Sequence, residues 1–124
     1  MKLNYIEQGD GNSVFLIHGL FGSLSNLGHL ARALASNYRV ISVDLRNHGD
    51  SPHNSEMSLK SMAQDIVNLM DNLSLPSAYF VGHSLGGKVV MQLAMVEPER
   101  VKSIVVADIA PVNYTDNNTN IINI

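Results

Sequence analysis

The chain has 124 residues, of which 45% are apolar and 15% are charged, and this length suits one compact domain. Its formal net charge is -3 and Lys and Arg form no cluster that would neutralise a phosphate backbone, so nucleic acid is not an expected partner. Because the chain contains no cysteine, disulfides, thiolate metal sites and a cysteine nucleophile are excluded as well.

Strand-like and helix-like patterns alternate along the chain. Short apolar runs predict strands, and apolar residues that recur every three or four positions predict helices. The expected elements are a strand over 2–7, a tight turn over 9–12, a strand over 13–17, a helix over 24–36, a strand over 38–43, a helix over 59–73, a strand over 78–81, a helix over 87–96 and a strand over 101–107. Ser58 is the expected N-cap of the helix over 59–73, and Pro76 follows its end.

This alternation predicts the fold class. Strands that are apolar throughout, such as 13–17, are typical of parallel sheets covered on both faces. Successive strand, helix and strand units form right-handed crossovers. We therefore expect an α/β protein with a doubly wound, mostly parallel sheet and helices on both faces. The strand over 101–107 would be a bare hydrophobic edge if nothing followed it, so we expect it to be covered or to mediate self-association.

The residues after the strand over 78–81 carry the clearest chemical signal. Gly82, His83, Ser84, Leu85 and Gly86 form a G-x-S-x-G sequence between a strand and a helix. Glycines at both ends allow a sharp turn that exposes the Ser84 hydroxyl for attack on a carbonyl carbon. The helix that follows offers free N–H groups to the oxyanion that the attack creates. The alternative is a glycine-rich turn in which Ser84 is only an N-cap.

A second loop follows the strand over 13–17 and contains His18, Gly19 and Leu20. A serine nucleophile in this setting needs a second backbone N–H to bind the negative charge, and it comes from a neighbouring loop. Leu20 is the expected donor, with Leu85 as its partner. On its own, a His-Gly pair is also consistent with an ordinary turn.

Four motifs in this order give the chain a family resemblance. They are His18–Ser23, Asp44–Ser51, Gly82–Gly87 and Asp108–Val112. Together they resemble the α/β-hydrolase superfamily and are most similar to small bacterial cytosolic esterases that cleave carboxylic esters and acyl-CoA thioesters. The resemblance implies that Arg46, Gly49 and Ser51 shape a loop near the site rather than take part in chemistry.

The serine needs a base, which is normally a histidine oriented by a carboxylate. The resembling esterase branch uses the Asp of the motif at Asp108, although an Asx turn before Pro111 is the alternative for this residue. None of the five histidines follows His83, whereas the family order is Ser, acid, His. His48 or His53 could replace the base, but we expect the catalytic histidine to be absent from this chain.

The sequence therefore predicts the N-terminal part of a hydrolase core over 1–112 and the start of a truncated cap region over 113–124, with a cap helix beginning near Asn120. The expected activity is hydrolysis of small ester or acyl thioester substrates through an acyl-enzyme on Ser84, weak or absent in this fragment. The alternatives are an acyl-ligand-binding or strand-pairing fragment and another reaction of the fold, such as haloperoxidase or carbon–carbon bond hydrolysis.

Nothing in the sequence predicts a cofactor, a metal, a nucleic-acid partner or a membrane partner. Apolar runs such as Val14–Ile17 fall far short of the ~20 residues of a membrane-spanning helix. The first seven residues lack the apolar centre of a signal peptide. The sequence thus predicts a cytoplasmic protein.

Overall fold

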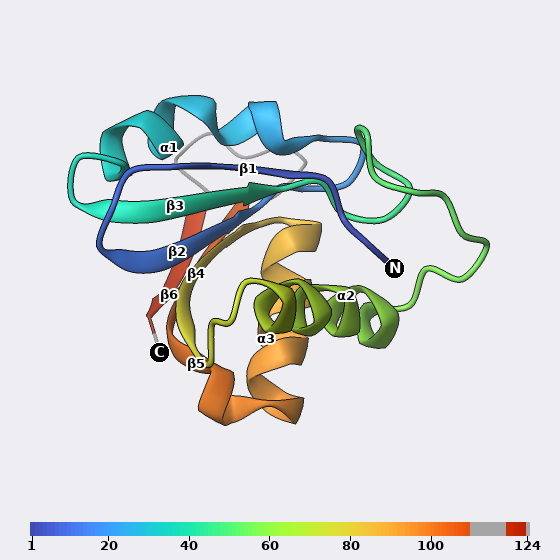
Figure 1. Cartoon of the computed structure of the whole chain (residues 1–124). Helices are drawn as coiled ribbons and strands as arrows, with labels where there is room; N and C mark the ends of the chain where they lie inside the picture. The colour runs from blue at the N-terminus through green and yellow to red at the C-terminus, as the bar shows by residue number, and fades with distance from the viewer. Residues whose placement is uncertain (110–118, 124) are drawn as a thin grey trace.

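A computed structural model describes residues 1–109 and 119–123 of the chain. Its centre is a six-stranded sheet with the order β1-β3-β2-β4-β5-β6 (Figure 1). The strands are β1 (Tyr5–Gln8), β2 (Asn12–Ile17), β3 (Tyr38–Val43), β4 (Ala78–His83), β5 (Val101–Ile109) and β6 (Thr119–Asn123). The helices are the 3₁₀ helix η1 (Leu24–Leu27), α1 (Gly28–Leu34), α2 (Leu59–Asn72), α3 (Leu85–Val96) and the 3₁₀ helix η2 (Pro98–Arg100).

The four central strands run parallel, which confirms the predicted fold class. β2 pairs with β3 and β4, and β4 pairs with β5, all in parallel, whereas β1 and β6 are antiparallel to their neighbours. In this register Ile17 lies opposite both Val43 and Gly82, and Gly82 lies opposite Val106. The loops that follow β2, β3 and β4 therefore begin side by side, at the carboxyl ends of the parallel strands.

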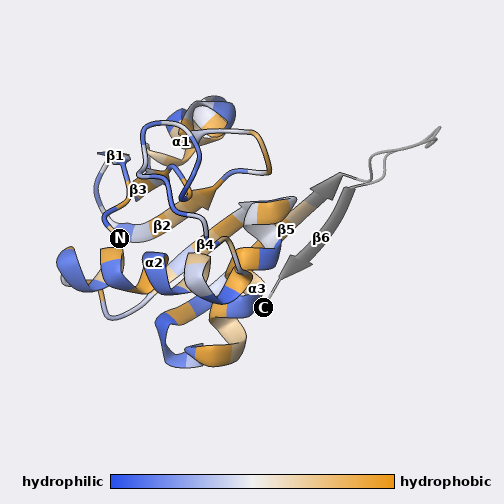
Figure 2. Cartoon of the chain, turned by 90° about the vertical axis from the view of Figure 1, so that its right-hand side faces the viewer, coloured by the Kyte–Doolittle hydropathy of each residue, from blue (hydrophilic) through white to orange (hydrophobic). Residues whose placement is uncertain are grey.

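Helices cover both faces of the sheet, with α1 on one side and α2 and α3 on the other (Figure 1). Alternate residues of β2 explain why both faces are apolar. Val14 and Leu16 pack in the smaller core cluster together with Ala31 of α1, whereas Phe15 and Ile17 belong to the larger cluster together with residues of α2 and α3. Figure 2 shows hydrophobic residues along the strands and hydrophilic ones on the outer side of α2.

The helix α2 forms as its sequence pattern predicts. The Ser58 side chain accepts a hydrogen bond of 3.0 Å from the Ser61 N–H and so caps the first turn. One side of the helix is buried, and its exposed side carries polar residues. No helix among the described residues is long and apolar enough to cross a membrane.

One helix differs in detail from the sequence prediction, and the turn over 9–12 forms as predicted. The segment expected as a single helix over 24–36 is the 3₁₀ helix η1 followed by α1. At this turn Gly9 and Gly11 have φ of 81° and 118°, and the strands on either side of it, β1 and β2, are not paired with each other. Instead the turn crosses the start of β3, where a Cβ on Gly9 would lie 2.2 Å from the Tyr38 carbonyl oxygen. β1 then pairs with β3, because that edge of the parallel sheet is open.

The prediction of a cap helix beginning near Asn120 is wrong for the described residues. Thr119–Asn123 is strand β6, antiparallel to β5, with Asp108 opposite Asn120 in the register. The bare edge expected at β5 is therefore occupied, since the backbone groups of an apolar strand need partners. β-Branched Ile121 and Ile122 favour a strand at this place. The boundary between 112 and 113 lies outside the described residues and stays a prediction.

Candidate active site

The turn between β4 and α3 holds Ser84 in an unusual backbone conformation. Ser84 has φ of 55° and ψ of -115°, which an L-residue adopts only under strain. Glycines on both sides make this turn possible. A Cβ on Gly82 would lie 2.5 Å from the Gly86 carbonyl oxygen, and one on Gly86 would lie 2.1 Å from the Ile17 carbonyl oxygen. The tight turn that the G-x-S-x-G pattern predicts is therefore present.

The backbone around Ser84 is anchored on both sides. The Ser84 N–H donates a 3.0 Å hydrogen bond to the Ala107 carbonyl oxygen of β5, and the Ser84 carbonyl oxygen accepts one of 3.2 Å from the Lys88 N–H. Because Lys88 makes the first bond within the helix, the N–H of Leu85 lies in the first turn of α3, where N–H groups have no partner inside the helix. This helix end favours negative charge beside Ser84.

The loop after β2 lies directly against this turn. A Cβ on Gly19 would be 3.1 Å from the Ser84 Cβ and 3.1 Å from the His83 Nδ1. The two segments meet at residues that the sequence analysis assigned to the oxyanion loop and to the nucleophile turn. Glycine at position 19 is what allows this close approach.

Residues 19–22 form a β-turn at the mouth of the site. The Gly22 N–H donates a 3.0 Å hydrogen bond to the Gly19 carbonyl oxygen, and Phe21 has φ of 62°. A positive φ at the third position is typical of a type II turn. In such a turn the N–H of the second residue, here Leu20, is not used by the turn. Leu20 and Phe21 are 52% and 92% exposed.

His18 is a buried support of this turn rather than a free base. Its Nε2 accepts a 3.0 Å hydrogen bond from the Leu45 N–H, so its Nδ1 carries the proton and donates to the Gly19 carbonyl oxygen at 2.7 Å. Burial is the main cause that lowers the pKa of His18 below its ordinary value of 6.5. Its imidazole is therefore neutral and both of its nitrogens are occupied.

Among the described residues, the other histidines make no hydrogen bond to the Ser84 hydroxyl. His48 is buried, with its Nδ1 2.8 Å from the Arg46 carbonyl oxygen and its ring 5.0 Å from that of His18. His29 lies on α1, and its Nδ1 is 3.0 Å from Arg32 Nη2, while His53 is exposed. Within the described part of the chain, no histidine nitrogen is hydrogen-bonded to Ser84 Oγ.

Asp108 lies on β5 immediately after Ala107, whose carbonyl oxygen accepts the Ser84 N–H. The backbone therefore brings position 108 beside the turn that carries Ser84. The side chain of Asp108 lies outside what the structure describes, as does Pro111. The role of Asp108 as triad acid remains a prediction.

The loop after β3 is held by a buried ion pair and by a buried carboxylate. Arg46 makes two hydrogen bonds to Asp65 of α2, with Nε–Oδ2 at 2.7 Å and Nη2–Oδ1 at 2.9 Å. Ser51 Oγ donates to the Asp44 carbonyl oxygen at 2.6 Å, and Gly49 lies against the Asp44 carboxylate. Arg46, Gly49 and Ser51 thus shape the loop. The family resemblance pointed to these three residues, but no local pattern in the sequence pointed to Asp44 and Asp65 as their partners.

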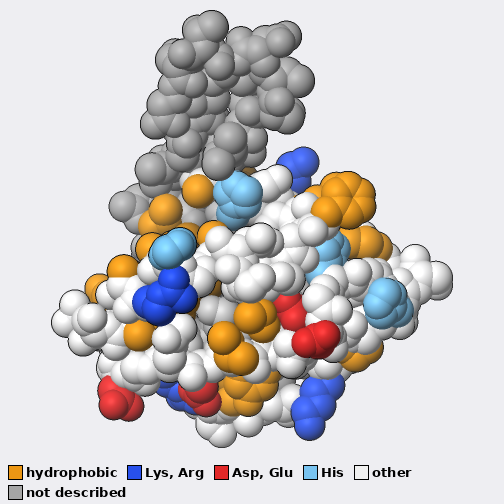
Figure 3. All heavy atoms as spheres, turned by 90° about the horizontal axis from the view of Figure 1, so that it is seen from above, with side chains coloured by type: hydrophobic (Ala, Val, Ile, Leu, Met, Phe, Trp, Pro, Cys, Tyr) orange, Lys and Arg blue, Asp and Glu red, His pale blue; other side chains and the backbone are white. Residues whose placement is uncertain are grey.

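Two hollows flank the turn at Leu20 and Phe21. One, of about 390 Å³, extends towards His48 and Met57, and the other, of about 510 Å³, extends towards His83. Figure 3 shows histidine side chains lying among hydrophobic ones on the upper face of the molecule. Leu20 and Phe21, which line both hollows, therefore present exposed apolar side chains beside His48 and His83. Among the described residues, no group of three or more His, Asp or Glu is arranged to hold a metal ion.

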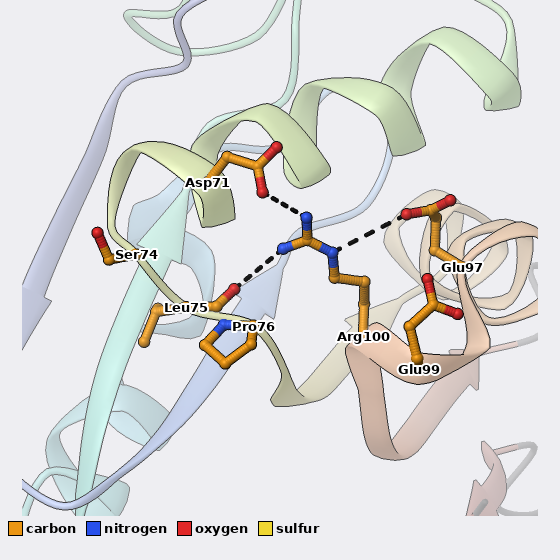
Figure 4. A pocket seen from close by; sticks show the side chains of 7 residues that line it. All are labelled: Asp71, Ser74, Leu75, Pro76, Glu97, Glu99 and Arg100. Atoms are coloured by element: carbon orange, nitrogen blue, oxygen red, sulfur yellow. Dashed lines mark hydrogen bonds and ion pairs between the residues drawn. The ribbon is translucent and has the colours of Figure 1, made fainter.

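A further hollow, of about 510 Å³, lies at the amino-terminal ends of the parallel strands, where β4 and β5 begin (Figure 4). Arg100 spans it, donating to the Leu75 carbonyl oxygen at 3.1 Å, pairing with Asp71 of α2 and lying 3.9 Å from Glu97. Ligands of open α/β sheets bind at the carboxyl ends of the strands, so this hollow is on the wrong side for that role. The Arg100 cluster instead joins α2 to the start of β5.

The fold and this site define an α/β protein with a strained serine between a central parallel strand and its helix. The family model described as alpha/beta hydrolase fold matches residues 12–122, and the chain belongs to this family. It is 47% identical over 119 residues to the esterase YbfF of Escherichia coli, covering 92% of this chain and 47% of that protein. It is 46% identical over 120 residues to the mouse sn-1-specific diacylglycerol lipase ABHD11, covering 93% of this chain and 39% of that protein.

A solved structure of a marine microorganism esterase superposes with a TM-score of 0.85 at 39% identity, covering 93% of this chain and 44% of the esterase. The chain thus spans about half the length, or less, of each of these relatives.

Proposed function

We propose that this chain carries the nucleophile half of a serine hydrolase that cleaves carboxylic esters or acyl thioesters. The observation that carries the proposal is the strained conformation of Ser84, with φ of 55°, between Gly82 and Gly86 and against Gly19. Strain of this kind persists only where the surrounding structure enforces it, and it is frequent at reactive sites. The names of the esterase and lipase relatives support an ester substrate.

The reaction proceeds through an acyl-enzyme. Ser84 Oγ attacks the acyl carbonyl carbon while a histidine takes the hydroxyl proton, and the N–H groups of Leu20 and Leu85 stabilise the oxyanion. The bond to the alcohol or thiol breaks, and the histidine returns the proton to this leaving group. Water then attacks the acyl-enzyme and gives a proton to the same histidine. The histidine returns this proton to Ser84 Oγ as the bond to the acyl group breaks and the acid is released. Asp108 orients the histidine.

The base comes from outside these 124 residues in this proposal. His18 has both nitrogens engaged, and His48 is buried against the Arg46 carbonyl oxygen. Removing one member of a triad leaves a residual rate that comes from the oxyanion hole and substrate binding. We therefore expect this chain by itself to react slowly.

The apolar surroundings favour apolar acyl groups. Leu20, Phe21 and Met57 line the hollow of about 390 Å³ beside the turn, and each is more than one third exposed. An acyl chain that covered them would remove apolar surface from water, which favours binding by roughly 25 cal/mol per Å².

A fluorophosphonate probe tests the nucleophile on the 124-residue chain. With imidazole added as an external base, we expect a single adduct located by mass spectrometry at Ser84, and we expect imidazole to accelerate its formation. Ser84→Ala should show no adduct, and Ser36→Ala, which changes an exposed serine, should react like the original chain. Equal modification of Ser84→Ala would refute the assignment of the nucleophile.

Once Ser84 is shown to react with the fluorophosphonate, turnover of a panel of substrates distinguishes the possible reactions. Turnover of p-nitrophenyl esters or acyl-CoA, lost in Ser84→Ala, supports the proposed hydrolysis. Turnover of only haloperoxidase or carbon–carbon hydrolase substrates would contradict ester hydrolysis and assign that reaction to the protein instead. Binding of a fatty acid without any turnover, even with imidazole, would instead favour an acyl-binding role.

A further inference from the structure

The loop that contains Leu20 is held at both ends by two consecutive residues that follow β3. At its start, the Leu45 N–H donates to His18 Nε2 at 3.0 Å, and His18 Nδ1 donates to the Gly19 carbonyl oxygen at 2.7 Å. At its end, the Leu24 N–H donates to Asp44 Oδ1 at 2.7 Å. The β-turn at Leu20 lies between these two attachments.

The Asp44 carboxylate joins three segments that are distant in sequence. Besides the Leu24 N–H, it accepts hydrogen bonds of 2.9 Å from the Asp50 N–H and from Asn4 Nδ2, both at Oδ2. Asp44 is only 2% exposed. Burial raises the pKa of its carboxyl, but the bonds from Asp50, Asn4 and Leu24 outweigh burial and hold this pKa below its ordinary value.

The main chain of Asp44 is fixed as firmly as its carboxylate. The Asp44 N–H donates to the Asn4 carbonyl oxygen at 2.9 Å, and the Asp44 carbonyl oxygen accepts from Ser51 Oγ at 2.6 Å. Ser51 Oγ in turn accepts from the Asn4 N–H at 2.8 Å. A Cβ on Gly49 would lie 2.3 Å from the carboxylate, so glycine at this position leaves the space that the carboxylate occupies.

We propose that Asp44 is a positioning residue for the oxyanion loop. Its carboxylate sets the place of Leu24 and, together with the His18 attachment, the path of residues 19–24 against Ser84. The Leu20 N–H is then held in one orientation before any substrate binds, which is how an oxyanion donor contributes most. This inference rests on the proposed function for the role of Leu20, whereas the hold on the loop can be measured without it.

Asp44→Asn is the primary variant, because it keeps the shape of the side chain but places an amide NH₂ either against the Leu24 N–H or against the Asp50 N–H and Asn4 Nδ2. The matched control is Asp10→Asn, which makes the same chemical change at an exposed position in the turn before β2. If Asp44→Asn does not fold, Asn4→Ala removes one donor from the same carboxylate and tests the same contact.

Amide hydrogen exchange measured by NMR is the first readout. We expect Asp44→Asn to accelerate exchange at Leu24 and Gly22 by roughly tenfold relative to buried amides of α2, which corresponds to about 1.4 kcal/mol. Asp10→Asn should leave this ratio unchanged, and Asn4→Ala should raise it by a smaller factor. An unchanged ratio in both Asp44→Asn and Asn4→Ala would overturn the inference.

The rate at which fluorophosphonate modifies Ser84 in the presence of imidazole is the second readout. A fall of about tenfold in Asp44→Asn, with Asp10→Asn unaffected, is the expected result. Faster exchange at Leu24 without slower modification would show that Asp44 holds the loop while the loop does not serve Ser84, which overturns the positioning role. Modification of Ser84→Ala at the original rate would count against the proposed function alone, and the exchange result would still stand.

Discussion

Ser84 has backbone dihedral angles that glycine adopts more readily than serine. Its φ of 55° and ψ of -115° carry a cost on the order of 1–3 kcal/mol for a residue with a Cβ. The hydrogen bonds of its N–H to Ala107 and of its carbonyl oxygen to Lys88 hold it there. The backbone strain is therefore located at Ser84 itself, the residue that carries the proposed nucleophilic hydroxyl.

Relief of this strain can be measured directly. We expect Ser84→Gly to unfold in urea with a free energy about 1 kcal/mol higher than that of Ser84→Ala, since both lack the hydroxyl and only glycine relaxes the backbone. Both variants should be unreactive towards fluorophosphonate. Equal unfolding free energies would mean that the turn does not store strain at Ser84.

At the scale of elements, α2 is joined to its neighbours by two ion pairs of very different burial. Asp65 and Arg46 are 3% and 9% exposed, whereas Asp71, which pairs with Arg100, is 55% exposed (Figure 4). The buried pair connects α2 to the loop after β3, and Arg46 also donates to the Glu56 carbonyl oxygen at 2.9 Å. Burial decides how much each pair matters, because water competes for the exposed one.

The contributions of the two ion pairs to stability can be compared by removing the partner that each has on α2. Asp65→Ala should lower the free energy of unfolding by about 3–5 kcal/mol, because it leaves the Arg46 guanidinium buried without a counter-charge. Asp71→Ala should lower it by less than about 1 kcal/mol. Urea unfolding followed by circular dichroism gives both values. The double variant Arg46→Met/Asp65→Leu should recover much of the loss, and a loss as large as that of Asp65→Ala would contradict this account.

For the whole molecule, two buried groups make stability depend on pH. The pKa of His18 is lowered from 6.5, so below this pH the unfolded chain binds more protons than the folded chain does. The free energy of unfolding therefore falls as the pH drops below about 6.5. The pKa of Asp44 is lowered from 3.8, so its contribution is present above 3.8 and is lost as the pH falls further.

Urea unfolding midpoints measured between pH 8 and pH 3 test this expectation. We expect a plateau above pH 7, a first decline that begins near 6.5 and a second below 3.8. NMR should show His18 as the neutral tautomer with its proton on Nδ1 at pH 6.5, where an ordinary histidine is half protonated. A midpoint that stayed constant between pH 7 and pH 5 would show that His18 does not resist protonation.

Local patterns accounted for most elements of the molecule. The strands over 13–17 and 38–43 and the helix over 59–73 lie within a residue or so of their expected places, since apolar periodicity and the Ser58 cap are properties of neighbouring residues. The same patterns were wrong near Asn120, where a strand replaces the expected helix. That outcome depends on β5, whose free backbone groups are a tertiary partner invisible in a short window of sequence.

The sequence by itself determined the parallel sheet and the sharp turn at Ser84, because a continuous apolar run is a local signal of a buried strand and the paired glycines of G-x-S-x-G are a local signal of a tight turn. Only the tertiary structure decided how the site is supported. Asp44 binds Asn4 and Leu24, which are 40 and 20 residues away, and Arg46 binds Asp65 at 19 residues. These contacts join the loop after β3 to the segment before β1, to η1 and to α2, which become neighbours only when the chain folds, so no spacing along the chain specifies them.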